Sequence, residues 1–452
     1  MVFSNPIFVF MFLPVCFLVY WILNDKYKNA WLLFCSLFFY AWSGIKFLVL
    51  LLFSVLVNYL LGKYLARRDK RALIIGVSFN LCLLVFFKYT KFIFEMIPGC
   101  NVENIPFIAQ IVLPIGISFY TFQILAYDID VYYQKVPVQK SFSKLCLYIT
   151  MFPQLIAGPI VRYIDIESQI NERSVNYEKV YEGLKRFIYG LAKKVLLADV
   201  LGGFTEEVFL IGGNGTIVSW LGMLAYSLQI YFDFSGYSDM AIGMGKMLGF
   251  DFLENFDNPY WSKSIKEFWR RWHISLSSWF RDYLYIPLGG NRKGTLATYR
   301  NLAIVFLATG LWHGASWNFV VWGLWHGLFL IVERIGFGKI LEKLPIIIQR
   351  IYALIIVGTG WLMFRTEDLK ANLMNIITLF RYRDSAVAEI LTLFDTKLIL
   401  SFVFGIALCV FGSKKQIKTN SIVNDVVTIG LFLIVLLQIS TSNFSPFLYF
   451  RF

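Results

Sequence analysis

The sequence predicts an all-α polytopic membrane protein, and three observations carry this prediction. Hydrophobic residues make up 58% of the 452 residues and aromatic residues 18%, and the mean hydropathy is +0.63. These values are typical of membrane proteins rather than of soluble chains. The apolar residues form helix-length segments separated by short basic clusters. We therefore expect one integral-membrane domain over 1–452, with about eleven spans plus re-entrant and amphipathic helices.

The net charge of +13 does not indicate a nucleic-acid partner, because the lysines and arginines lie between apolar segments, as in cytoplasmic membrane loops. The six cysteines are dispersed without a C-x-x-C pair, so neither a disulfide framework nor a metal knuckle is expected. Three histidines without acidic residues at ligand spacing argue against a metal site. No bound cofactor is expected.

A basic cluster indicates how the early spans are oriented in the membrane. Residues 7–24 are apolar without a preceding basic region, so they predict an uncleaved first span. Lys63, Arg67, Arg68, Lys70 and Arg71 mark a cytoplasmic loop, which places the N-terminus outside the cytoplasm. The apolar segments around this cluster are 30–43, 45–62 and 72–87.

The middle of the chain contains helix breakers and a basic region. Proline and glycine should kink the spans within 106–133 and 151–163, next to protein or a water-filled cavity. Residues 175–197 have helical amphipathic spacing and predict a helix along the cytoplasmic surface or a partly immersed span with a solvated charged face. A span at 216–234 precedes the basic region 255–300, which should be cytoplasmic.

The run from Leu302 to Val332 has no charged residue. As one helix it would be roughly 46 Å long, well beyond a hydrocarbon core of roughly 30 Å. It must tilt or break, and Gly314-Ala-Ser316 is the expected break, with Ser316 able to cap a new helix. His313 would then lie at a helix end facing a cavity. In a continuous helix His313 and His326 would be roughly 20 Å apart, which argues against a pair.

Further spans are expected at 346–364, 396–412 and 423–440. Lys414, Lys415 and Lys418 indicate that the loop before the last span is cytoplasmic. The aromatic tail 443–452 should therefore be extracytoplasmic, like the N-terminus.

The histidines are the first candidates for chemistry. An intramembrane ionisable group beside helix-breaking residues suggests a function, so we interpret His313 as a general base. His273 lies among cations that favour its neutral form, and His326 is interpreted as structural. Arg270 and Arg271, interleaved with aromatic residues such as Trp272, suit an anionic aromatic ligand such as coenzyme A. ATP-binding, zinc-protease and serine-hydrolase motifs are absent from the sequence.

Several blocks resemble the membrane-bound O-acyltransferases, especially the bacterial alginate and peptidoglycan O-acetyltransferase branch. They are Phe152-Pro-Gln-Leu-Ile-Ala-Gly-Pro-Ile160, Phe268-Trp-Arg-Arg-Trp-His273, Trp312-His-Gly-Ala-Ser-Trp317 and Gly323-Leu-Trp-His-Gly327. The resemblance covers essentially the whole chain. It implies a helical bundle around a central channel, with a buried histidine, His313, where two funnels meet and His273 as the second characteristic polar position.

The resemblance also implies a reaction. An acetyl group would pass from cytosolic acetyl-CoA, the donor substrate, across the bacterial inner membrane to an extracytoplasmic polysaccharide such as alginate or peptidoglycan. The tail Phe447-Leu-Tyr-Phe-Arg-Phe452 resembles an F-x-Y-x-x-F element whose tyrosine, here Tyr449, carries the acyl group. A tail that only anchors in the membrane interface is the alternative. His273 and Asn318 are candidates for polarising the thioester or orienting the base.

The partners expected are a periplasmic or surface-anchored acetyltransferase or esterase-like protein and membrane lipid. Two other functions stay open at this point. One is D-alanyl transfer to teichoic acid. The other is a non-enzymatic exporter of a lipid-linked sugar, although an anionic cargo would find no counter-charge in 302–332.

Overall fold

The computed structural model describes residues 2–211, 215–382, 387–412, 422–441 and 447–448, which contain helices and no strand. They divide into two compact units. Unit 1 is Met1–Phe187 with Tyr237–Leu253, and unit 2 is Ile188–Gly236 with Glu254–Phe452. Helices α10 (Tyr177–Ala192) and α12 (Thr216–Met247) contribute to both units. The all-α prediction is confirmed, and a single functional domain over 1–452 stays a prediction.

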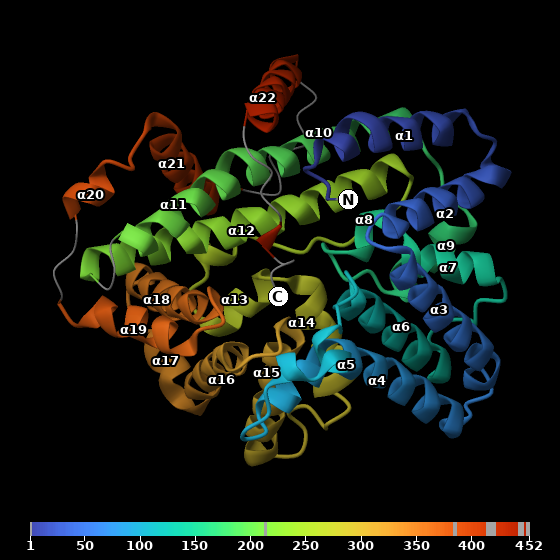
Figure 1. Ribbon diagram of the computed structural model, residues 1–452, viewed down its shortest axis with the longest axis horizontal. Helices are drawn as coiled ribbons and strands as arrows, with labels where there is room; N and C mark the ends of the chain where they lie inside the picture. The colour runs from blue at the N-terminus through green and yellow to red at the C-terminus, as the bar shows by residue number, and fades with distance from the viewer. Residues whose placement is uncertain (1, 212–214, 383–386, 413–421, 442–446, 449–452) are drawn as a thin grey trace. The chain divides into compact units, whose positions relative to one another are not determined.

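Unit 1 holds the N-terminal helices, drawn from blue to green in Figure 1. Besides parts of α10 and α12 they are η1 (Phe8–Phe12), α1 (Leu13–Ile22), α2 (Asp25–Ala41), α3 (Ile45–Leu65), α4 (Lys70–Glu95), η2 (Val102–Asn104), α5 (Pro106–Ala109), α6 (Ile117–Tyr132), α7 (Phe142–Thr150), α8 (Phe152–Leu155) and α9 (Tyr163–Asn171).

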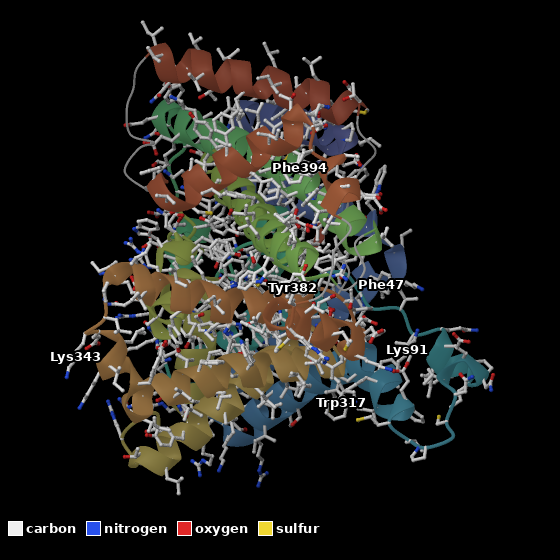
Figure 2. All side chains as sticks on the ribbon, turned by 90° about the vertical axis from the view of Figure 1, so that its left-hand side faces the viewer. Phe47, Lys91, Trp317, Lys343, Tyr382 and Phe394 are labelled. Carbon is white, nitrogen blue, oxygen red and sulfur yellow. The ribbon has the colours of Figure 1, made fainter. Side chains whose placement is uncertain are left out.

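Unit 2 holds the helices that follow. They are η3 (Lys193–Ala198), α11 (Asp199–Ile211), η4 (Pro259–Trp261), α13 (Ile265–Arg271), α14 (Ile274–Phe280), η5 (Arg281–Tyr285), α15 (Thr295–His313), α16 (Trp317–Val332), η6 (Glu333–Phe337), α17 (Gly338–Leu341), α18 (Ile346–Phe364), α19 (Leu369–Phe380), α20 (Val387–Leu391), α21 (Thr396–Phe411) and α22 (Ile422–Thr441). In Figure 2, Lys343, in the connection between α17 and α18, points away from the helices.

Five helical stretches in the described ranges are long and apolar enough to cross a membrane, and three shorter apolar helices accompany them. The predicted spans at 45–62, 346–364, 396–412 and 423–440 correspond closely to α3, α18, α21 and α22. Helix α22 exposes most of its apolar side chains, as a lipid-facing helix would. The total of about eleven spans and the predicted sidedness stay predictions. The cluster Lys414–Lys418 lies outside the described residues.

The stretch 106–133 is broken, as its prolines and glycines predict. Helix α5 ends at Ala109, and α6 begins only after Gly116, whose φ of 78° is left-handed. A side chain at Gly116 would also lie 2.6 Å from the Leu155 carbonyl oxygen. Glycine is therefore required here by both conformation and space.

The helix predicted within 175–197 is present as α10, but part of its charged face is not solvated. In unit 1, Arg186 of α10 forms a 2.5 Å ion pair with Asp239 of α12, and Lys246 of α12 pairs with Glu182. Lys185 is buried as well. The charged residues recur at helical spacing, as the sequence predicts. Several of them contact α12 instead of solvent. Burying such charges is tolerable only because they are paired.

The uncharged run 302–332 forms an antiparallel hairpin of α15 and α16. Gly310 and Gly323 lie opposite each other, and a Cβ on either would come within 2.3 Å of a carbonyl oxygen of the other helix. The break falls at Gly314–Ser316, as predicted. Ser316 is the N-cap residue of α16, but its side chain does not cap the helix and instead contacts Asn318. The hairpin tip, at His313, builds the site described next.

Candidate active site

His313 is the last residue of α15 and is buried, with 5% of its surface exposed. Its imidazole contacts three aromatic rings, with centroid distances of 5.0 Å to Trp312, 4.8 Å to Trp322 and 5.1 Å to Phe364. These rings come from α15, α16 and α18, so the hairpin and α18 together fix the imidazole. His313 is therefore packed against aromatic rings at a helix end.

His326 lies much closer to His313 than a continuous helix would allow. Both imidazoles contact Trp322, at centroid distances of 4.8 and 5.2 Å, because α16 folds back along α15. The estimate of roughly 20 Å applied only to a continuous helix, and the break at Gly314–Ser316 removes that condition. His326 is fully buried, and neither of its ring nitrogens has a hydrogen-bond partner among the described residues. It packs against Phe268, Trp269 and Trp361.

His273 links α13 and α14 and adopts a left-handed backbone conformation, with φ of 44°. Its Nδ1 lies 3.1 Å from Asn255 Oδ1, which also accepts hydrogen bonds from the backbone N–H and the hydroxyl of Ser275. Because this oxygen only accepts, Nδ1 carries the proton and donates it. Nε2 is then an acceptor, and it has no partner in the described part of the chain.

Burial also sets the charge of His273, which lies outside the long apolar helices. Loss of contact with water lowers its pKa to about 3, so the imidazole is neutral at physiological pH. The cationic neighbours in the sequence predict the same neutral form for a different reason. A neutral imidazole with a buried, unoccupied Nε2 is a hydrogen-bond acceptor or a base.

Aromatic rings connect His273 to His313 and to the tail. The imidazole of His273 packs edge-on against Phe234 of α12 at 4.6 Å and lies 6.0 Å from Trp312, the neighbour of His313. The ring of Phe447 also lies near Phe234, at a centroid distance of 6.0 Å. His273, His313 and Phe447 therefore belong to one side-chain cluster within unit 2.

The tail is buried where it is described. Phe447 is 1% exposed and Leu448 is 8% exposed, and the Leu448 N–H donates to Asp233 Oδ2 at 2.7 Å. Figure 1 shows this short red segment beside α12. Tyr449 and the remainder of 443–452 lie outside the described residues.

The predicted ligand-binding residues have different environments. Arg270 is exposed, whereas the Arg271 guanidinium pairs with Glu267 at 2.8 Å and donates to the Asp257 carbonyl. Trp272 is 3% exposed and packs against Trp361 and other rings, so it belongs to the core.

Asn318 is fully buried and donates to the Met363 carbonyl of α18 at 3.4 Å. The described residues contain no group of three potential metal ligands from His, Cys, Asp or Glu.

Sequence reasoning missed three contributors to this cluster: Asn255, Trp322 and Asp233. Asn255 has an ordinary sequence context, and Trp322 lies in the tryptophan-rich stretch around His313, but only the fold shows that each contacts a histidine. Asp233 carried a usable signal, because a carboxylate inside an apolar span is costly and needs a partner. A search for charged residues inside predicted spans would have found it.

The central part of the chain, residues 132–364, matches the model of the membrane-bound O-acyltransferase family. The chain belongs to this membrane-bound O-acyltransferase family. His273, His313 and the α15–α16 hairpin all lie within the matched region, and the tail lies beyond it. The family and the long apolar helices together show that the protein is a multi-pass membrane protein.

Curated proteins of known name are similar to this chain over much of its length. "Probable alginate O-acetylase AlgI" of Azotobacter vinelandii is 39% identical, with all of both chains covered. "Peptidoglycan O-acetyltransferase" of Helicobacter pylori is 38% identical over 82% of this chain and 78% of its own. "Teichoic acid D-alanyltransferase" of Bacillus subtilis is 27% identical over 66% of this chain and 79% of its own. The prediction of an O-acetyltransferase enzyme is confirmed by the family and the first two relatives.

Proposed function

We propose that this enzyme moves an acetyl group from cytosolic acetyl-CoA across the bacterial inner membrane, for O-acetylation of an extracytoplasmic polysaccharide such as alginate or peptidoglycan. The observation that carries this proposal is the side-chain cluster of unit 2, where Phe447, Phe234, His273, Trp312 and His313 follow one another in ring contact. The two acetyltransferase relatives favour acetyl over D-alanyl as the group transferred.

In the proposed step, His313 takes the proton from the Tyr449 hydroxyl, and the phenolic oxygen attacks the thioester carbonyl. A C–O bond forms, the C–S bond breaks, and the coenzyme A thiolate takes the proton from the imidazolium. A base is needed because the ordinary pKa of a tyrosine hydroxyl is about 10. The acetyl-tyrosine then passes its acetyl group to a periplasmic or surface-anchored partner transferase.

His273 fits one of its two predicted roles better than the other. Polarising a thioester carbonyl requires an N–H donor, but the Nδ1 proton of His273 is directed to Asn255. Its free Nε2 suits acceptance of a hydrogen bond from a hydroxyl. We propose that His273 orients the attacking hydroxyl while His313 removes its proton. Arg270, exposed near the end of α13, would bind the anionic coenzyme A.

The role of His313 is tested by a matched pair of variants, His313→Leu and His326→Leu, assayed for release of the coenzyme A thiol. Loss of a general base should slow release by roughly 10²–10⁴-fold in His313→Leu. His326→Leu should stay within about tenfold of wild type, because its nitrogens make no hydrogen bond to the described residues. Equal losses in both folded variants would contradict the assignment of the base.

A D-alanyl donor is the competing reaction, and it is favoured by the teichoic acid D-alanyltransferase relatives, which are 27% identical. The purified enzyme would be offered labelled acetyl-CoA and, separately, D-alanine as a thioester on a carrier protein. Label transferred from acetyl-CoA alone is the expected result. Transfer from the D-alanyl carrier alone would replace acetate by D-alanine in the proposal.

A further inference from the structure

A buried ion pair holds the two described residues of the tail. The Asp233 carboxylate accepts the Leu448 N–H through Oδ2 at 2.7 Å, and its Oδ1 lies 2.6 Å from Lys194 Nζ. Lys194 also pairs with Asp199 at 2.7 Å. The side chains of Asp233 and Lys194 are 2% and 4% exposed. All four residues belong to unit 2, and the histidines and the family resemblance do not account for them.

The physical chemistry of this carboxylate explains its attachment to the tail. A buried carboxylate is tolerated only when its oxygens are paired or hydrogen-bonded. Lys194 neutralises one oxygen, and the tail amide is the donor seen at the other. A hydrogen bond to a charged acceptor is roughly twice as strong as one between neutral groups. Asp233 therefore gains a buried partner when the tail is in place.

Adjacent residues of α12 and of the tail form a two-point contact. Asp233 holds the backbone of Leu448, while the ring of the next residue, Phe234, contacts the ring of Phe447 at 6.0 Å. Asp233 contacts the backbone amide of Leu448, so this contact does not depend on which side chain residue 448 carries. It fixes which position along the tail lies beside Asp233. The aromatic contact does require a ring at position 447.

We infer that Asp233, neutralised by Lys194, is a positioning residue that docks the C-terminal tail on α12 through the Leu448 amide. The contact fixes the register of the tail, so that the residue after Leu448 is the one offered to the histidines. This last consequence rests on the proposed function, in which Tyr449 carries the acetyl group. The docking itself does not.

Docking is measured by hydrogen–deuterium exchange of the C-terminal peptide in the purified full chain, without substrate. Asp233→Ala removes the acceptor, and Leu448 amide exchange should become about tenfold faster or more, the size expected for losing a charge-assisted hydrogen bond. Asp199→Asn is the matched control, because it leaves both Asp233 and Lys194 in place and should keep the wild-type rate. Equal exchange in wild type and a folded Asp233→Ala variant would overturn the inference.

A second pair of variants keeps Asp233 and changes the donor, in case Asp233→Ala fails to fold. Leu448→Pro removes the N–H, whereas Leu448→Ala keeps it. Acetylation of Tyr449 should fall about tenfold or more in the proline variant and much less in the alanine variant. Equal rates in the two would also overturn the inference. Absence of acetyl-Tyr449 in wild type would refute the proposed carrier and leave the exchange result to decide the docking.

Discussion

His273 has a backbone conformation that few residues with a side chain adopt. Its φ of 44° lies in the left-handed region, where a β-carbon costs about 1 kcal/mol or more. Asn255 offsets this cost, because its backbone carbonyl accepts the Ile274 N–H and its side-chain oxygen binds both His273 and Ser275. One asparagine thus fixes the turn, the tautomer and the direction of Nε2.

Removal of Asn255 should therefore damage catalysis more than substrate binding. In Asn255→Ala the Nδ1 proton loses its acceptor, and kcat should fall by about tenfold or more with little change in the KM for acetyl-CoA. Asn255→Asp keeps an oxygen acceptor at the same position and should recover part of kcat. A rise in KM alone, or no rescue by aspartate in a folded protein, would show that Asn255 has only a structural role.

The neutral state of His273 predicts how the stability of the protein depends on pH. Its folded pKa of about 3 lies below the unfolded value of about 6.5, so protons bind the unfolded chain preferentially as pH falls. The stability that depends on the neutral imidazole is present above the unfolded pKa and is lost as the pH falls below it. The free energy of unfolding should therefore decrease by ~2 kcal/mol between pH 7 and pH 5. Thermal unfolding of His273→Asn over this pH range should show a shallower decline than wild type. Parallel declines would refute the burial of a neutral imidazole.

At the scale of elements, the α15–α16 hairpin explains how the histidines come together. The sequence was sufficient to predict the break, because an uncharged run of this length exceeds a bilayer. It did not reveal that the chain reverses direction there, since helical periodicity is the same in a kinked helix and in a hairpin. The glycines at 310, 323 and 327 become informative only once the two helices are seen to face each other.

The close approach of the two helices can be tested with alanine. In Gly310→Ala the new methyl group would lie 2.3 Å from the Phe319 carbonyl oxygen, so the hairpin must open and stability should fall by ~1–3 kcal/mol. Gly430→Ala is the matched control in α22, where a Cβ meets nothing within 4 Å. It should be neutral or stabilise by ~0.5–1 kcal/mol. Thermal unfolding compares the two, and an unaffected Gly310→Ala would refute the hairpin contact.

For the molecule as a whole, the hairpin agrees with the distribution of charge. The basic region before α15 and the cluster Arg334, Lys339 and Lys343 after α16 lie near the open end of the hairpin, and His313 lies at its closed end. A single broken span that crosses the membrane would place these two basic segments on opposite sides of it. The positive-inside rule therefore favours the hairpin over a crossing helix.

Sequence alone predicted the fold class and most long apolar helices, and it selected His313 and the tail as candidates whose catalytic roles stay predictions. Composition and segment length determine the first two, and a histidine in an apolar run is conspicuous. Sequence alone could not predict the pairing of α10 charges with α12, or the contact of Asp233 with Leu448, because these residues are 53 and 215 positions apart. Contacts of that range depend on tertiary packing and have no local pattern.

The role of Tyr449 as acetyl carrier is tested by locating the label after the purified full chain reacts with labelled acetyl-CoA. The C-terminal peptide would be isolated and sequenced by mass spectrometry. We expect an acetyl group on the Tyr449 oxygen in wild type, and none in His313→Ala or Tyr449→Phe. Acetyl transfer at the wild-type rate in Tyr449→Phe, or label on a different residue, would contradict it.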